Sequence, residues 1–165
     1  MRILLLSDTH IPSRARTLPP GLWERLSSAD LVLHAGDLES ADILDEMESV
    51  ARDFRAVRGN MDPPSLSSRL PELEILEVEN ITLALVHGHQ WGRPRPTRVA
   101  QEMAGRADVV VFGHNHIPAV RKLGDVLVVN PGSPTCPRGH LGPTCALLTV
   151  EGEKADVEVI EVESD

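Results

Sequence analysis

The stretch RILLLSDTH, residues 2–10, places a short apolar run directly before an aspartate and a histidine. An uninterrupted apolar run of this length predicts a strand that is buried on both faces, as in a parallel sheet covered by other layers. A carboxylate at the end of a buried strand costs free energy unless it finds a partner, and a cation can be that partner. Asp8 and His10 are therefore candidate metal ligands.

The same transition from an apolar run to potential ligands recurs further along the chain. It is found in DLVLHAGD (30–37), RAVRGNMD (55–62), ITLALVHGHQ (81–90) and VVVFGHNH (109–116). The candidate ligands at these strand ends are Asp37, Asn60, His87, His114 and His116. Because α/β proteins place ligand sites at the carboxyl ends of their strands, we expect these side chains to gather at one edge.

The remaining segments predict how the strands are covered. Helices are expected around residues 21–28, from Ser40 onward, and over 97–105 with Thr97 as the cap. After residue 118 the segments AVRKL, VLVVNPGS, CALLTV and ADVEVIEV follow with Gly, Pro and Asp between them, which predicts antiparallel strands. This order predicts an α/β fold of two packed mixed β-sheets flanked by helices, in a single domain over residues 1–165.

The composition limits the classes of function. A net charge of −9 opposes a general nucleic-acid or anionic-membrane binder, which needs a basic surface. A small phosphate-bearing substrate stays compatible, because bound cations can reverse the local charge. Cys136 and Cys145 form no CxxC motif and are interpreted as inert thiols. The apolar runs are too short to span a membrane and no signal-peptide pattern is present, so we expect a cytoplasmic protein.

The candidate ligands offer oxygen and imidazole donors and no thiolate. This set is too large for one structural zinc ion, and it suits two divalent cations that share a carboxylate. Two such ions repel each other, and a bridging carboxylate lowers that cost. Asp37 is the candidate bridge, because Gly36 before it leaves room for a close approach. A hydroxide held between the ions would then attack a phosphoester.

The two histidines of GHNH are separated by one residue. In an extended chain, residues i and i+2 point the same way, so His114 and His116 are expected over one pocket, with Asn115 facing away. Their spacing favours two neighbouring metals over one. His34, inside an apolar run, is interpreted as a core histidine or as support for a ligand.

The motifs SDTH, GDLES, GNMD, HGHQ and GHNH, in this order, resemble those of the calcineurin-like metallophosphoesterase superfamily. The small size and the later NPGSP (130–134) are similar to its compact branch of YfcE-type phosphodiesterases, to which the eukaryotic retromer subunit Vps29 is related. The resemblance extends from Arg2 to about Val150. It implies an αββα sandwich with a dinuclear metal site at one end.

The resemblance also implies a ligand set. The first metal would be held by Asp8, His10, Asp37 and His116, and the second by Asp37, Asn60, His87 and His114. All of these positions carry the residue type of the family. Manganese is the first expectation for the two divalent ions, and nickel, iron, zinc and magnesium are alternatives, because mixed His and Asp ligands suit several metals.

One position departs from the pattern of many relatives. Met61 stands where they have a histidine that is thought to protonate the leaving group. This departure favours the small phosphodiesterases over phosphoprotein phosphatases. The general acid stays open between His89 and a metal-bound water.

These observations together predict a metal-dependent phosphodiesterase that acts on a small phosphodiester. The alternatives are a Vps29-like scaffold that binds protein and a nuclease, which the acidic charge disfavours. No membrane partner is expected, and a homo-oligomer stays open. The basic cluster Arg93, Arg95 and Arg98 is either a solvated loop or a surface that attracts an anionic substrate.

Overall fold

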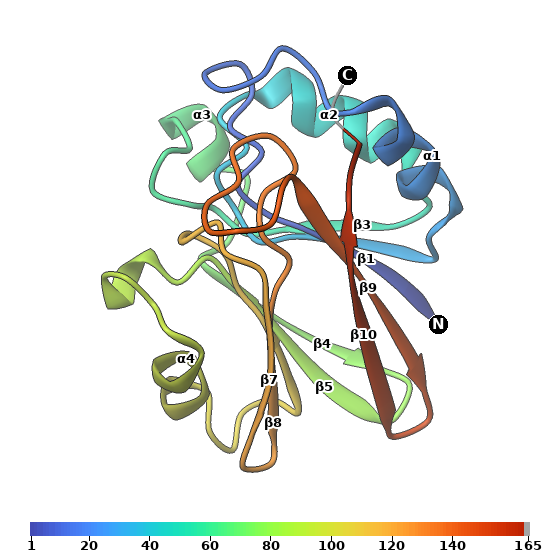
Figure 1. Cartoon of the computed structure of the whole chain (residues 1–165), viewed down its shortest axis with the longest axis vertical. Coiled ribbons are helices and arrows are strands. Elements are labelled where there is room, and N and C mark those ends of the chain that lie inside the picture. Colours follow the sequence, from blue (N-terminus) through green and yellow to red (C-terminus); the bar gives the residue numbers. More distant parts are fainter. Residues whose placement is uncertain (164–165) are drawn as a thin grey trace.

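The structure, a computed structural model, describes residues 1–163 and contains two packed five-stranded sheets (Figure 1). In spatial order, the first sheet contains β10 (Lys154–Glu161), β9 (Thr144–Glu151), β1 (Arg2–Leu6), β2 (Leu31–His34) and β3 (Phe54–Ala56). The second contains β4 (Leu73–Val78), β5 (Ile81–Val86), β6 (Val109–Val111), β8 (Val126–Asn130) and β7 (Ala119–Leu123). The predicted fold of two mixed sheets is confirmed. Of the domain expected over 1–165, residues 164–165 lie outside the described range.

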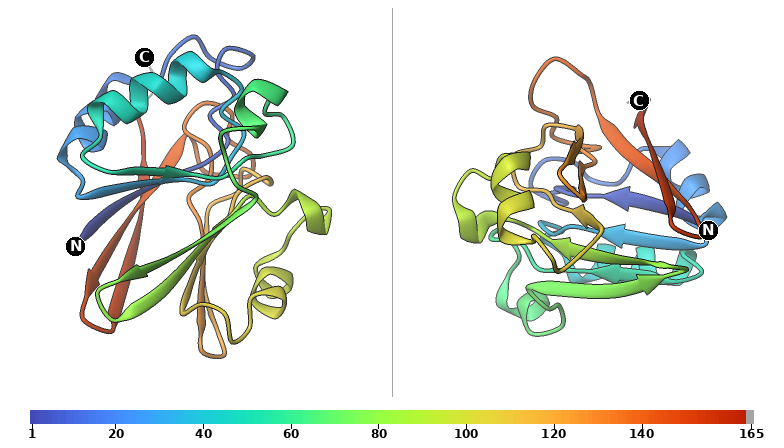
Figure 2. Two further views of the ribbon diagram at one scale, coloured as in Figure 1. Left: turned by 180° about the vertical axis from the view of Figure 1, so that it is seen from behind. Right: turned by 90° about the horizontal axis from the view of Figure 1, so that it is seen from below.

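Helices cover the outer faces of the two sheets. The helices are α1 (Pro20–Ser28), α2 (Ala41–Val50), α3 (Pro64–Ser67) and α4 (Pro96–Glu102), with a short 3₁₀ helix η1 (His89–Trp91). Figures 1 and 2 show α1 and α2 against the first sheet and α4 against the second. Within residues 1–163, no helix has the length and apolar character needed to cross a membrane.

The apolar run of β1 is buried on both faces because both faces are covered. Ile3 and Leu5 belong to the core between the two sheets, which also contains Leu83 of β5. Leu4 and Leu6 belong to a second core, beneath α1 and α2. The prediction of a doubly buried first strand is therefore confirmed.

The later strands divide between the two sheets. β9 and β10 form an antiparallel hairpin that joins the first sheet beside β1, and β7 and β8 form a hairpin in the second. The prediction of antiparallel strands is confirmed for both hairpins, but β8 also pairs in parallel with β6. The strand with which each hairpin pairs decides its sheet: β9 pairs with β1 of the first sheet, and β8 pairs with β6 of the second.

Two local features differ from the expectation. β4 is not predicted from the sequence, since its residues LEILEV do not strictly alternate, and it pairs antiparallel with β5 at the edge of the second sheet. α4 begins at Pro96 with Arg95 as its N-cap, so Thr97 lies inside the helix rather than at its cap. Proline suits the first helical position because its missing N–H would have no partner there.

The parallel strands define the edge that carries the site. β1, β2 and β3 run parallel in the first sheet, and β5, β6 and β8 run parallel in the second. The loops that follow these strands meet at one end of the two-sheet stack (Figure 1).

Candidate metal centre

The loops after five strands bring the predicted ligands into two groups. Asp8, His10 and His116 form the first group, and their potential ligand atoms lie within 4.8 Å of one another. Asp37, His87 and His114 form the second group by the same measure. The structure therefore places His114 and His116 in different groups.

The first group leaves two imidazole nitrogens facing each other. The Nδ1–H of His10 donates to Glu39 Oε1 at 2.6 Å, and the Nδ1–H of His116 donates to the carbonyl oxygen of Cys136 at 2.6 Å. In neutral rings, the Nε2 atoms then both carry lone pairs, and they lie 3.1 Å apart. His116 Nε2 is also 3.5 Å from Asp8 Oδ1. Lone pairs in this arrangement repel, so the group suits a cation.

The second group has the same character. His87 is buried, and its Nδ1–H donates to the carbonyl oxygen of Ala35 at 2.6 Å. Its Nε2 faces oxygens of Asn60 at 3.2 Å and Asp37 at 3.3 Å. The ring of His114 lies edge-on to that of His87, with centroids 5.1 Å apart. Burial lowers the pKa of His87, but the hydrogen bond to Asp37 and the charges of nearby carboxylates raise it overall, so this group also attracts positive charge.

Asp37 lies between the two groups. Its Oδ2 is 3.3 Å from His87 Nε2 and 3.6 Å from His10 Nε2. Its Oδ1 accepts a hydrogen bond from the Met61 N–H at 2.8 Å, which holds the carboxylate in place. Burial alone would raise the pKa of Asp37, but the bonds from His87 and Met61 lower it to about 2. An ionised carboxylate in this position can contact cations on both sides.

Asp8 is in a different electrostatic state. It is fully buried, and burial raises its pKa to about 6 despite the charges and hydrogen bonds around it. Ser7 Oγ–H donates to its Oδ2 at 2.6 Å, and the His114 N–H points at both of its oxygens at 3.0 and 3.1 Å. A buried carboxylate that is destabilised by desolvation gains from a neighbouring cation, so this residue too fits a metal.

The backbone at the site is left-handed rather than extended. At the site, the non-glycine residues with positive φ are Asp8 (55°), His10 (45°), Asp37 (60°), Glu39 (73°), His114 (72°) and His116 (60°). The extended geometry expected for residues 114–116 is therefore wrong, although both histidines reach the site. Such angles cost on the order of 1–3 kcal/mol each and persist where surrounding contacts hold them.

Two supporting acidic residues were not identified from the sequence. Glu39 holds the ring of His10, as described above, and Asp62 accepts hydrogen bonds from the N–H groups of Asp37, Glu39 and Gly59 at 3.1, 2.8 and 2.7 Å. Both stand two positions after a candidate ligand, within GDLES and GNMD. The sequence contains this spacing, but the spacing alone does not indicate which acidic side chains point toward the site.

Other polar residues support the loops. His34 is buried, its Nδ1 accepts the Gly36 N–H at 3.2 Å, and its Nε2 is 3.3 Å from Thr9 Oγ1. Burial lowers the pKa of His34 to about 3, so it stays neutral and supports the two loops beside it. Ser133 donates to the carbonyl oxygen of Asp8 at 2.7 Å and is buried, which makes it a loop contact.

His89 lies beside the second group. Its ring centroid is 5.3 Å from that of His87 and 6.3 Å from that of His114. Burial, followed by the charge of His87, lowers the pKa of His89. Its Nδ1 is buried and has no hydrogen-bond partner within residues 1–163.

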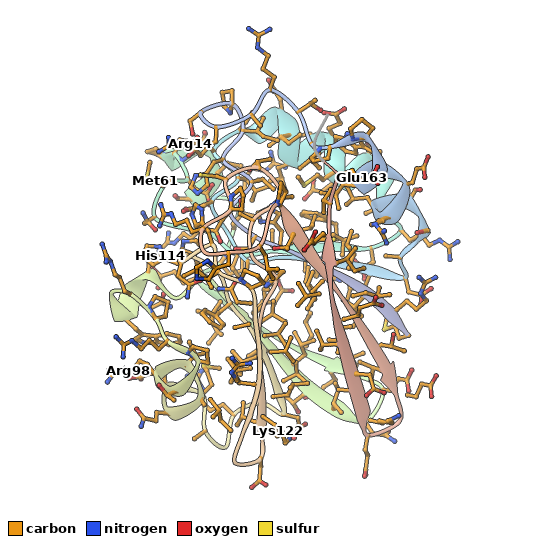
Figure 3. All side chains as sticks on the ribbon, in the orientation of Figure 1. Arg14, Met61, Arg98, His114, Lys122 and Glu163 are labelled. Carbon is orange, nitrogen blue, oxygen red and sulfur yellow. The ribbon has the colours of Figure 1, made fainter. Side chains whose placement is uncertain are left out.

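A cavity of about 270 Å³ opens onto the donors of both groups. Its lining includes His10, Asp37 and His114 from the site, and Arg14 and Met61 at its rim. Figure 3 shows the last three of these on the same side of the molecule. Met61 is 54% exposed, so it faces an incoming ligand without holding a proton to donate.

Comparison with known proteins identifies the family. The calcineurin-like phosphoesterase superfamily domain matches residues 1–153. A probable metallophosphoesterase of Methanothermobacter thermautotrophicus is 40% identical over 97% of this chain and 92% of its own length. A probable metallophosphoesterase of Methanocaldococcus jannaschii is 37% identical over 99% of this chain and 82% of its own.

A solved structure shows the same fold. The crystal structure of Vps29 from Chaetomium thermophilum superposes with a TM-score of 0.82 over 99% of this chain and 100% of that chain, at 24% identity. The family resemblance expected from the five motifs is confirmed by these matches. Families of this kind bind divalent metals, and the structure contains two candidate sites for them. This chain belongs to the calcineurin-like phosphoesterase superfamily.

Proposed function

We propose that the chain is a metal-dependent phosphodiesterase that hydrolyses a small phosphodiester. The observation that carries the proposal is the position of Asp37, whose Oδ2 lies 3.3 Å from a nitrogen of one donor group and 3.6 Å from a nitrogen of the other. A carboxylate between two sets of converging donors supports two neighbouring divalent cations.

In this proposal each cation would have three ligands of its own, and Asp37 would serve both. The first is held by Asp8, His10, Asp37 and His116, and the second by Asp37, Asn60, His87 and His114. Manganese is the first candidate, and nickel, iron, zinc and magnesium are the alternatives. When bound, the two ions supply Lewis acidity that activates water and neutralises charge on the phosphoryl group.

The side chains then position the reacting groups. Glu39 and the carbonyl groups of Ala35 and Cys136 fix the rings of the histidines so that Nε2 faces the cavity. Arg14 and Arg138 at the rim of the cavity attract the anionic ester. His89 acts as a positioning residue beside His87 and His114, because its ring centroid lies 5.3 Å from that of His87 and 6.3 Å from that of His114, and it belongs to neither group of ligands.

A diester is favoured over a monoester by the space around the site. Cavities lie on both sides of His114, so substituents on both ester oxygens have room. Separately, Met61 provides no proton at the rim, so we expect a leaving group that needs little protonation.

The test is hydrolysis of bis(p-nitrophenyl) phosphate with added Mn²⁺, compared with p-nitrophenyl phosphate. We expect turnover of the diester that is lost after chelation, restored by Mn²⁺, and abolished in Asp37→Asn. Activity that survives both chelation and this substitution would contradict the mechanism. A matched control is Asp42→Asn on α2, an acidic residue outside both donor groups.

The alternative is a protein-binding scaffold, and the likeness to Vps29 is the observation that favours it. A Vps29 from Chaetomium thermophilum has been solved with a cyclic peptide. This alternative predicts no metal-dependent turnover of any phosphoester and a stable protein partner in a pull-down. The complete set of ligand residues supports the enzyme, because residues of this set are held in left-handed backbone, which costs free energy and clusters at active sites.

A further inference from the structure

A second cavity adjoins the one that opens onto the donor groups. It has a volume of about 480 Å³ and is lined by Arg93, His114, Asn115, Ile117 and Arg138. His114 and Arg138 also line the first cavity. The two cavities are therefore neighbouring parts of one cleft, and His114 stands between them.

Hydrogen bonds tie both arginine-bearing loops to the segment that carries the histidines. The Nδ2–H of Asn115 donates to the carbonyl oxygen of Pro94 at 3.1 Å, next to Arg93. On the other side, the N–H of Arg138 donates to the carbonyl oxygen of His116 at 3.2 Å. The backbones of the two arginines are thus placed relative to the donor groups.

The arginines of the cleft have no acidic partner. Within residues 1–163, the arginines that form ion pairs are Arg52, Arg55, Arg58, Arg69 and Arg98. Arg14, Arg93 and Arg138 line the cleft and are not among them. On a chain with a net charge of −9, uncompensated arginines around one cleft indicate an anionic ligand.

The structure also separates the arginines that the sequence grouped together. Arg98 pairs with Glu102 at 2.6 Å on α4, and Arg95 is exposed and lines neither cavity. Arg93 alone of the three faces the cleft. It lines only the second cavity, whereas Arg138 lines both.

We propose that Arg93, together with Arg138, binds a second phosphate of the substrate, which is then a phosphodiester that carries a further phosphate on one arm. The inference rests on the proposed phosphodiesterase function. The scissile phosphate lies over the donor groups, Arg138 reaches between the cavities, and Arg93 receives the second phosphate. Guanidinium groups suit this role because their N–H fork matches phosphate oxygens. Ile117, 46% exposed, offers an apolar contact to the linking part of the arm.

The test uses two substrates that differ only by the second phosphate. Thymidine 5′-(p-nitrophenyl phosphate) has one anionic group, and its 3′-phosphorylated derivative has two. With Mn²⁺, we expect kcat/KM to be about 10-fold higher for the second, since a charge-assisted hydrogen bond contributes at least a factor of this size. Arg93→Gln should remove this preference and Arg95→Gln should keep it.

The outcomes separate the inference from the function on which it rests. Equal kcat/KM for both substrates overturns the inference and leaves the phosphodiesterase function intact. If neither substrate is hydrolysed, the proposed function fails, and calorimetry with thymidine 3′,5′-bisphosphate and thymidine 5′-monophosphate decides the inference. Binding of the bisphosphate about 10-fold more tightly, lost in Arg93→Gln, supports it. Equal dissociation constants overturn it.

Discussion

At the scale of single residues, the candidate centre is a set of acceptors that face one another. The Nδ1–H groups of His10, His87 and His116 all donate to acceptors that are not among the assigned metal ligands. Their Nε2 lone pairs are therefore turned toward the carboxylates of Asp8 and Asp37. Such an arrangement is unfavourable by itself and becomes favourable around cations. These side-chain contacts are therefore the most direct support for metal binding.

The first prediction concerns the two histidines of GHNH. His114→Ala and His116→Ala should each remove one of the two ions, because the structure places these residues in different donor groups. Metal analysis of the purified variants after loading with Mn²⁺ measures the stoichiometry. His140→Ala, on an exposed loop, is the control. Loss of both ions in each variant, or of neither, would contradict the assignment.

The second prediction concerns Glu39, which holds the ring of His10 by a hydrogen bond of 2.6 Å. Glu39→Gln should weaken binding at the first metal by about 10- to 100-fold, the usual effect of losing the partner of a ligating histidine. Competition with a chelator of known affinity measures the change. Glu46→Gln, on α2, should bind metal like the unaltered chain. An unchanged affinity in Glu39→Gln would show that the ring needs no such support.

At the scale of elements, close contacts between strand ends bring the donors together. A Cβ on Gly113, after β6, would lie 1.9 Å from Ser7 Oγ and 2.8 Å from Asp8 Oδ2, after β1. A Cβ on Gly59, after β3, would lie 2.1 Å from Asp37 Oδ1, after β2. Real Cβ atoms do not approach so closely. Gly113 of GHNH therefore permits the ends of β1 and β6 from the two sheets to meet, and Gly59 of GNMD permits the ends of β2 and β3 to meet within the first sheet.

The third prediction follows from this contact. Gly113→Ala should push the ends of β1 and β6 apart, so that Mn²⁺ binding is lost and the melting temperature falls by several degrees. Gly21→Ala is the matched control, since a Cβ there meets nothing within 4 Å. Calorimetric melting and metal analysis of both variants are the measurements. Full metal content in Gly113→Ala would refute the role of the contact.

At the scale of the whole molecule, the buried polar groups of the site make stability depend on pH. Burial lowers the pKa of His34 from 6.5 to about 3. The unfolded chain therefore takes up a proton at His34 first, and the folded state loses stability as the pH falls from about 6.5 toward about 3. Asp8 acts in the opposite sense, because its raised pKa of about 6 favours proton uptake by the folded state above 3.8.

The fourth prediction is that His34→Gln flattens the loss of stability in acid. In the metal-free protein, the free energy of unfolding of the unaltered chain should fall by about 2–3 kcal/mol more than that of His34→Gln between pH ~6.5 and ~4.5, at about 1.36 kcal/mol per pH unit. Urea denaturation at several pH values measures both. His140→Gln should follow the unaltered chain. If the free energy of unfolding changed equally with pH in the unaltered chain and in His34→Gln, the pKa of His34 would not be lowered in the folded state.

Much of the architecture follows from local patterns. The apolar runs of β1, β2, β5 and β6, each followed by carboxylate or imidazole side chains, predicted buried strands and a ligand-bearing edge. The alternation in β10 predicted a half-exposed strand. β4 lacks this alternation and is not predicted, and α4 begins at Pro96 rather than at residue 97. Patterns along the chain carry this information because the regular geometry of a strand or helix decides which of its side chains share a face.

The sequence by its own patterns established the strands, their helical cover, the family and the residue types that reach one edge. The tertiary structure alone decided the left-handed backbone of His114 and His116, the inward turn of Glu39 and Asp62, and the position of Arg93 in the cleft. These features depend on contacts between loops of different strands. Chain order does not encode such contacts locally, because they form only when both sheets are packed.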